Sequence, residues 1–216
     1  MNEVVIRPLR FSDDVPALRA FLETLGLRSR IESERGGWVD MVAGSGMVAL
    51  HDAASSSSGA KAGDTTLSFE ADDIDELKDR LLVAGYPDVT IWDEAYGRVL
   101  SVTAADETVI WIDERNDDLY GYKLHDAHPD TRWSVTPYLA GADQAAWQRF
   151  LEILGGDYLV YYGPREAEFA VRLDLRTTES LAEVATRLTA TGYEPRSDED
   201  GITLTDPDGQ TVQVHT

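Results

Sequence analysis

The sequence predicts an α+β protein of two tandem βαβββ-type modules, with mixed sheets cupped around a cavity and helices outside. Two observations carry this prediction. The segment FLETLG at 21–26 recurs as FLEILG at 150–155, and a second, looser repeat ends in Gly85-Tyr86 and in Gly192-Tyr193. Each copy also combines alternating strand patterns with segments of helical periodicity, as expected of a repeated supersecondary unit.

Each copy begins with a strand and a capped helix. The strands are expected at 4–11 and 134–140, and a polar turn suited to capping a helix follows each of them. Apolar residues at spacings of three and four then continue to Gly26 and Gly155. A left-handed C-cap is expected at both glycines.

The remainder of the first copy contains a hairpin, a loop and a second helix. Strands at 38–43 and 47–51 flank a Gly-Ser-Gly turn, and the serine-rich stretch 55–63 is typical of a flexible loop. Residues 66–71 alternate as a strand, and acidic residues at 72–76 favour the positive N-terminus of a helix.

The second copy repeats these elements in a shorter span, and both copies close with a hairpin. Its third strand is expected at 169–176 and its second helix starts near 178–181. The closing hairpins are predicted from strands at 98–103, 108–113, 201–205 and 211–215. We therefore divide the chain into a first module pair of βαβββ repeats at 1–114, a linker at 115–132 and a second, shorter module at 133–216.

The charge balance excludes several partners. The 216 residues include 40 Asp and Glu against 19 Lys and Arg, a formal charge of -21. Such a protein repels nucleic acid and anionic membranes, and no basic patch offsets this repulsion. Without cysteine there is no thiolate nucleophile or disulfide framework. With no signal-peptide pattern, we expect a cytoplasmic monomer or homodimer whose partner is a small molecule.

Several segments follow one another in a characteristic order. They are the strand-to-helix segment 6–27, FEADDID at 69–75, YGR at 96–98 and DPDG at 206–209. In this order the chain resembles the vicinal oxygen chelate superfamily, which includes glyoxalases, bleomycin-resistance proteins and extradiol dioxygenases. The resemblance implies paired glyoxalase-like modules whose cupped sheets form a ligand cavity.

The resemblance also implies where a metal would be held. Metal-dependent members place His, Glu or Gln on the first and last strands of a module. The corresponding positions, with the third-strand positions, are Ile6, Trp111, Thr66, Val135, Gln213 and Leu173. A divalent metal needs three or more converging oxygen or imidazole donors. We therefore expect no metal and no other cofactor, and favour a binding protein over an enzyme.

Aromatic residues point to the remaining chemistry. Trp111 occupies one of the implied ligand positions, and aromatic cavity walls bind planar or cationic molecules by stacking and cation–π attraction. The predicted ligand-binding residues are Trp38, His51, Glu70, Trp92, Tyr96, Trp111, Tyr138 and Gln213. Taken singly, each is also compatible with an ordinary structural role. Trp147 is expected on a helix surface or at a module interface.

We identify no catalytic residues, because no histidine lies near a Gly-x-Ser-x-Gly elbow and no phosphate-binding loop is present. The leading hypothesis is a metal-independent, bleomycin-resistance-like protein that binds a small hydrophobic or cationic aromatic molecule, as in sequestration of an antibiotic or metabolite. The alternative is a metal-dependent lyase, isomerase or dioxygenase of the same superfamily. A third is an interaction module whose cavity is filled by Ile6, Trp111 and Leu173.

Overall fold

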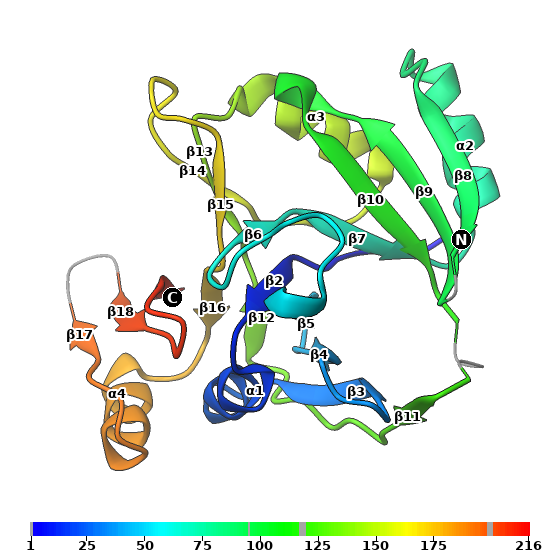
Figure 1. Ribbon diagram of the computed structural model, residues 1–216. Coiled ribbons are helices and arrows are strands. Elements are labelled where there is room, and N and C mark those ends of the chain that lie inside the picture. Colours follow the sequence, from blue (N-terminus) through cyan, green and yellow to red (C-terminus); the bar gives the residue numbers. More distant parts are fainter. Residues whose placement is uncertain (1, 95, 117–119, 198–200) are drawn as a thin grey trace.

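The computed structural model describes residues 2–94, 96–116, 120–197 and 201–216, and it confirms the predicted α+β class with βαβββ-like units (Figure 1). Within these residues four α-helices and four mixed sheets form two halves. The helices are α1 (Val15–Thr24), α2 (Ile74–Val83), α3 (Gln144–Leu154) and α4 (Leu181–Ala190). None of the described helices is long and apolar enough to span a membrane.

The first half contains two sheets, which we call upper and lower from their places in Figure 1. The upper sheet is, in order, β1 (Val4–Ile6), β7 (Ser68–Ala71), β10 (Val109–Glu114), β9 (Gly97–Thr103) and β8 (Val89–Glu94). The lower sheet is β11 (Tyr122–Leu124), β3 (Arg28–Ser33), β4 (Trp38–Val42), β5 (Met47–Asp52), β2 (Leu9–Ser12) and β6 (Thr65–Thr66). Short 3-10 turns occupy Ala53–Ser55 and Ala105–Glu107.

The second half repeats this plan with shorter strands. One sheet is β12 (Trp133–Val135), β16 (Leu175–Thr177), β19 (Thr211–His215), β18 (Ile202–Thr205) and β17 (Arg196–Ser197). The other is β14 (Tyr161–Tyr162), β13 (Tyr138–Ala140) and β15 (Ala170–Arg172).

The opening strand of each half divides between two sheets, which differs from the single strands expected at 4–11 and 134–140. The break lies at Arg7-Pro8 in the first half and at Thr136-Pro137 in the second. Proline has no N–H to donate to a ladder, so it marks the point where the chain leaves one sheet for the other. The crossing leaves Arg7 between the two sheets of the first half.

The predicted linker contributes a strand of its own. Within it, β11 pairs antiparallel with β3 and extends the edge of the lower sheet. His125 follows β11 and its Nε2 lies 3.0 Å from Glu32 Oε2. The described part of this segment, 115–116 and 120–132, is therefore attached to the first half, while 117–119 lies outside the described residues.

Two hydrophobic cores join the halves crosswise. One core packs α1 and the lower sheet with α4 and the β16–β19 sheet, and the other packs α2 and the upper sheet with α3. Trp147 of α3 is fully buried in the second core, where its ring stacks on Phe169. It is thus an interface residue and not a helix-surface residue.

The two sequence repeats contact each other across this interface. Arg80 of α2 donates a hydrogen bond to the carbonyl of Leu154 at the end of α3 (2.9 Å). Arg187 of α4 does the same to the carbonyl of Thr24 at the end of α1 (2.9 Å). Helix C-termini carry unpaired carbonyls and partial negative charge, so a guanidinium is well matched to them.

Tyrosines of the looser repeat reinforce these contacts. Tyr86 packs edge-on against Phe150, with ring centroids 5.5 Å apart, and Tyr193 packs edge-on against Phe21 at 5.0 Å. The Arg and Tyr of one half therefore recognise the FLExLG helix of the other half. Both repeated segments therefore take part in the contact between the halves.

We predict that Arg187→Ala lowers the free energy of unfolding by about 1–2 kcal/mol, a range that allows for the partial exposure of this side chain. The substitution removes the hydrogen bond to Thr24 and leaves the buried carboxylate of Glu179 without one of its partners. Urea denaturation measures the effect, with the exposed Arg149→Ala as matched control. Equal stability of the two variants would contradict the crosswise contact.

Candidate ligand-binding cavity

A cavity of about 400 Å³ lies between the upper and lower sheets of the first half. Side chains of both sheets, the serine loop at 55–58 and Tyr122 of β11 line it. Its volume falls in the range of small-molecule sites. The third hypothesis requires the absence of such a void, so the first half does not fit a filled interaction module.

Three aromatic rings from neighbouring strands form the lower wall. Phe11, His51 and Trp38 lie in register across β2, β5 and β4. The His51 ring centroid is 5.6 Å from that of Phe11 and 5.5 Å from that of Trp38. Such contacts hold the rings in fixed orientations, so this wall is formed before a ligand arrives.

The upper wall carries a second aromatic group at the rim. Trp111 on β10 is 45% exposed and packs edge-on against Trp92 of β8 at 5.9 Å. Trp92 donates a hydrogen bond to Glu94 (2.7 Å), and Tyr96 lines the cavity from the β8–β9 turn. A planar molecule between Trp38 and Trp111 would therefore meet aromatic surface from both sheets.

The floor of the cavity is a buried charge cluster centred on Arg7. The Arg7 guanidinium contacts Asp40 of the lower sheet (3.1 Å) and Asp113 and Glu70 (3.7 Å) of the upper sheet. It also lies 5.9 Å from the centre of the Trp38 ring. Arg7 lies between β1 and β2, where the chain crosses from one sheet to the other. Its guanidinium can therefore form ion pairs with carboxylates of both sheets.

Two further arginines complete the cluster. Arg30 of β3 pairs with both oxygens of Glu70 and with Asp40 (3.2 Å). Arg115 Nε donates to Glu70 (2.8 Å). Each carboxylate of the cluster is thus paired with at least one guanidinium, which offsets the cost of burying charge.

The environment shifts the ionisation of the cluster. Burial disfavours a charged Arg7, but Asp40, Asp113 and Glu70 outweigh it and raise the Arg7 pKa. Burial alone would raise the pKa of Glu70, but Arg30, with Arg7 and Arg115, holds that pKa below its usual range. Ionised Glu70 therefore stabilises the fold above its ordinary pKa, and this contribution is lost as the pH falls through the lowered value.

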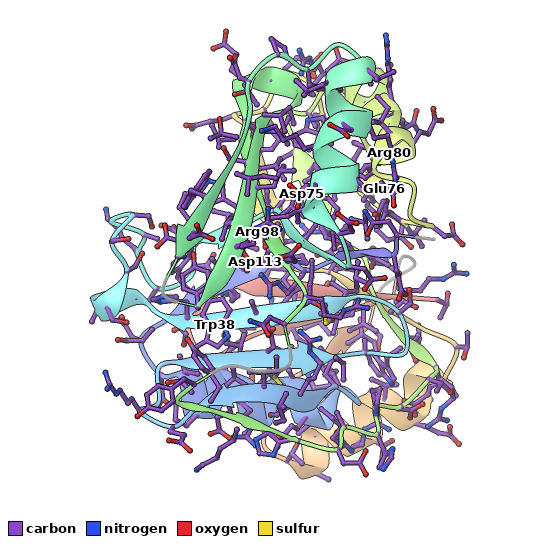
Figure 2. All side chains as sticks on the ribbon, turned by 90° about the vertical axis from the view of Figure 1, so that its right-hand side faces the viewer. Trp38, Asp75, Glu76, Arg80, Arg98 and Asp113 are labelled. Atoms are coloured by element: carbon purple, nitrogen blue, oxygen red, sulfur yellow. The ribbon has the colours of Figure 1, made fainter. Side chains whose placement is uncertain are left out.

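Asp113 is the cluster member most open to the cavity. Its side chain is 19% exposed, against 3% for Asp40 and 4% for Glu70. Arg7 contacts its Oδ2, whereas no residue in the described part of the chain donates a hydrogen bond to its Oδ1. Figure 2 shows Asp113 on the upper sheet above Trp38 of the lower sheet.

The pKa values around Asp113 reflect the same burial. Burial raises the pKa of Asp113, and the neighbouring carboxylates add to this rise against the pull of Arg7. Burial, with the negative charge of Asp113, raises the pKa of Tyr96 to about 12. Tyr96 therefore keeps its proton at neutral pH and remains a hydrogen-bond donor.

The cationic residue Arg98 also lines the cavity but is already paired. Its guanidinium binds Asp75 at the start of α2 (2.8 Å; Figure 2). It also binds Glu114, the residue after Asp113 (3.1 Å). Asp113 is the most exposed carboxylate of the cluster, and it lines the cavity together with Trp38 and Trp111.

The resemblance seen in the sequence implies a metal site, and the residues at the implied positions do not fit one. Ile6 is buried in the core shared with α2 and α3, Thr66 is exposed on β6, and Trp111 presents an indole. The carboxylates that do converge surround Arg7. Within the described ranges no group of three or more His, Cys, Asp or Glu is arranged to hold a metal ion.

The second half places two predicted site residues away from the cavity. Tyr138 lies under the Arg172 guanidinium, which is 4.2 Å from the ring centre, and Gln213 accepts a hydrogen bond from Thr203 (2.7 Å). Arg172 binds both oxygens of the fully buried Asp174 at 2.6 and 2.7 Å.

Further contacts fill this part of the second half. His215 Nε2 lies 3.0 Å from Asp174, and the His215 ring stacks on Tyr161 at 4.0 Å. Val135 and Leu173, at two implied metal positions, are buried in the core with α1 and α4. As in the first half, a guanidinium holds the carboxylate.

The structure thus brings together one group of the predicted ligand-binding residues and separates the rest. Those that line the cavity are Trp38, His51, Glu70, Tyr96 and Trp111. Trp92 supports Trp111, and the other two belong to the second half.

Sequence reasoning missed the charged floor, namely Arg7, Asp40 and Asp113. Arg7 and Asp40 are lone charges within or beside apolar strands, VVIRP and WVDMV, whereas Asp113 begins the charged run DER after VIWI. Lone charges in such strands are rarely buried unless they are paired. A lone charge within or beside an apolar strand was therefore the sequence feature that could have indicated a buried ion pair.

Comparisons with known proteins agree with the fold. Neither a protein-family model nor a curated protein sequence matches the chain. Among solved structures, catechol 2,3-dioxygenase superposes with a TM-score of 0.62 at 12% identity, covering 100% of this chain and 88% of that one. A 2,3-dioxygenase from Pseudomonas sp. KL28 gives 0.63 at 12% identity, covering 98% and 90%. A variant of 4-hydroxymandelate synthase from Streptomyces coelicolor gives 0.57 at 12% identity, covering 98% and 91%.

These likenesses span the whole chain and both halves. They confirm the sequence-based resemblance at the level of fold: the chain has the vicinal oxygen chelate fold of extradiol dioxygenases. At such low identity they do not assign an activity.

We predict that Arg7→Met destabilises the protein by about 3–5 kcal/mol at neutral pH, because it leaves buried carboxylates without their central cation. In the variant Asp113 loses its Arg7 partner, so its pKa, which burial already raises, lies further above that of the unfolded chain. The folded state then gains a proton at Asp113 as the pH falls, and the destabilisation shrinks as the pH falls through the raised pKa of this carboxyl.

Urea denaturation at several pH values measures this effect. The exposed lining residue Arg35 provides the control Arg35→Met. A difference between wild type and Arg7→Met that does not change with pH would contradict the charge cluster.

Proposed function

We propose that the protein binds a small planar, aromatic and cationic molecule in the cavity of the first half, without a metal. The observation that carries this proposal is the position of Asp113, whose Oδ1 accepts no hydrogen bond within the described residues and lies between aromatic walls. A cationic N–H of the ligand would supply the missing donor.

The energies favour this class of ligand. Stacking or cation–π contact with Trp38 and Trp111 contributes on the order of 0.5–2 kcal/mol per ring. A charge-assisted hydrogen bond to Asp113 adds about 1.5–3 kcal/mol. The formal charge of -21 further raises the local concentration of cations.

The charge of the lining supports the same choice. Of the lining arginines, Arg7 and Arg98 are bound to carboxylates and offer little to an anionic ligand, whereas Arg35 is exposed to solvent. A neutral aromatic molecule could use the walls but would form no ion pair with Asp113. The biological role that suits such a site is sequestration of an antibiotic or metabolite.

The alternative, a metal-dependent lyase, isomerase or dioxygenase, is supported by fold similarity alone. The carboxylates that such a site would need are bound to guanidinium groups in both halves. Elemental analysis of purified protein separates the two functions. Stoichiometric iron, manganese, zinc or nickel that survives dialysis, and that ligand binding requires, would favour the alternative.

We predict that the protein binds 9-aminoacridine, a planar cation at neutral pH, about tenfold more tightly than the neutral analogue acridine, a difference of about 1.4 kcal/mol. Asp113→Asn should remove this preference, because the amide cannot pair with the cation. Tryptophan fluorescence titration measures both affinities, and treatment with a chelator should change neither.

The matched control is Asp93→Asn, which makes the same change of net charge at an exposed position on β8. It should keep the preference for the cation. An equal preference in Asp113→Asn and wild type would show that Asp113 does not recognise the ligand.

A further inference from the structure

The mouth of the cavity is formed by a loop with local hydrogen bonds at its near end. There Ser55 Oγ donates to the carbonyl of Asp52 (3.1 Å) and the N–H of Ser56 to that of Ala53 (3.2 Å). Residues 55–58 of this loop, all serines, line the cavity. Ser56 and Ser58 share a hydrogen bond (2.7 Å), which is a contact within the loop. The position of these hydroxyls therefore depends on how the two ends of the loop are held.

Arg10 of β2 holds the far end. Its guanidinium donates hydrogen bonds to the carbonyl of Gly63 and to Thr65 Oγ1 (2.9 Å). Backbone hydrogen bonds between Phe11 and the loop, Gly63 N to Phe11 O and Phe11 N to Asp64 O, add to this attachment (both 2.9 Å). The strand that carries the cavity residue Phe11 thus also anchors the serine loop.

Arg10 is in turn held by the second half. Its Nη2 lies 2.5 Å from Asp206 Oδ2, and the two side chains are 3% and 1% exposed. Asp206 is fixed within the β18–β19 turn, because its Oδ1 accepts the N–H groups of Asp208 (3.0 Å) and Gln210 (2.8 Å).

The same turn touches the loop directly. A Cβ built on Gly63 would lie 2.6 Å from Gln210 Nε2, and the Gly63 φ of +94° is one that other residues rarely adopt. Asp208 Oδ1 accepts hydrogen bonds from Ser12 Oγ and from the N–H of Asp13 (both 3.1 Å). The β18–β19 turn therefore contacts both β2 and the far end of the serine loop.

We propose that Asp206 is a positioning residue for ligand binding in the first-half cavity, acting through Arg10 on the serine loop. The part of this inference that concerns affinity rests on the proposed function. Without the Asp206 charge, Arg10 is buried without its ionic partner, and turning toward water releases Gly63 and Thr65. The serine hydroxyls then have to be ordered when a ligand binds, and this ordering reduces affinity.

The test compares Asp206→Asn with the matched control Asp208→Asn, a change on the same turn that leaves the Arg10 partner intact. Hydrogen–deuterium exchange measures opening of residues 54–64 without any ligand. We expect exchange in this segment to rise about tenfold in Asp206→Asn, with the α2 and α3 core unchanged, and to stay near wild type in Asp208→Asn. Affinity for 9-aminoacridine should fall about threefold to tenfold in Asp206→Asn alone, with the preference over acridine retained.

Two results would overturn the proposal: loop exchange that stays at the wild-type rate in folded Asp206→Asn, or exchange that rises equally over the whole chain. If Asp206→Asn does not fold, Arg10→Lys keeps the charge pair but shortens the reach to Gly63 and Thr65, and the same loop-specific rise is expected. If wild type binds no cationic aromatic probe, the proposed function fails, while the exchange measurement still decides whether Asp206 positions the loop.

Discussion

The guanidinium of Arg7 cannot be buried alone, and its need for partners organises the first half of the molecule. Asp40 belongs to the lower sheet, whereas Glu70 and Asp113 belong to the upper sheet. The ion pairs of Arg7 with these three carboxylates therefore hold the two sheets at a fixed spacing and tilt. Trp38 lies on the same strand as Asp40, and Trp111 lies on the same strand as Asp113. The shape of the cavity between the two sheets therefore depends on the ion pairs that Arg7 forms.

The two halves have the same arrangement of sheets and helices but differ in the role that each plays in the molecule. Their helices pack crosswise, with Arg80 and Arg187 each binding the end of a helix in the other half. The first half keeps an open cavity, whereas in the second half Arg172 and His215 both contact Asp174 at the corresponding place. The second half instead supports the first, through the crosswise cores and through the β18–β19 turn on Arg10.

Periodicity and repeats were sufficient to predict the fold class, because helix caps, glycines and apolar spacing are local signals. The aromatic residues Trp38 and Trp111 were also accessible, since an indole at an alternating strand position is visible in the sequence. The charged floor was not, because the partners of Arg7 lie 33, 63 and 106 residues away and nothing local connects them. The division of the opening strand at Pro8 was missed for the same reason: only the tertiary structure assigns its two parts to different sheets.

A crystal structure of the protein with bound 9-aminoacridine tests the central claim most directly. The account predicts one ligand between Trp38 and Trp111, its cationic nitrogen within hydrogen-bonding distance of Asp113 Oδ1, and the Arg7 guanidinium in contact with Asp40 and Asp113. A metal ion among these carboxylates with Arg7 displaced, or a ligand bound outside this cavity, would contradict it.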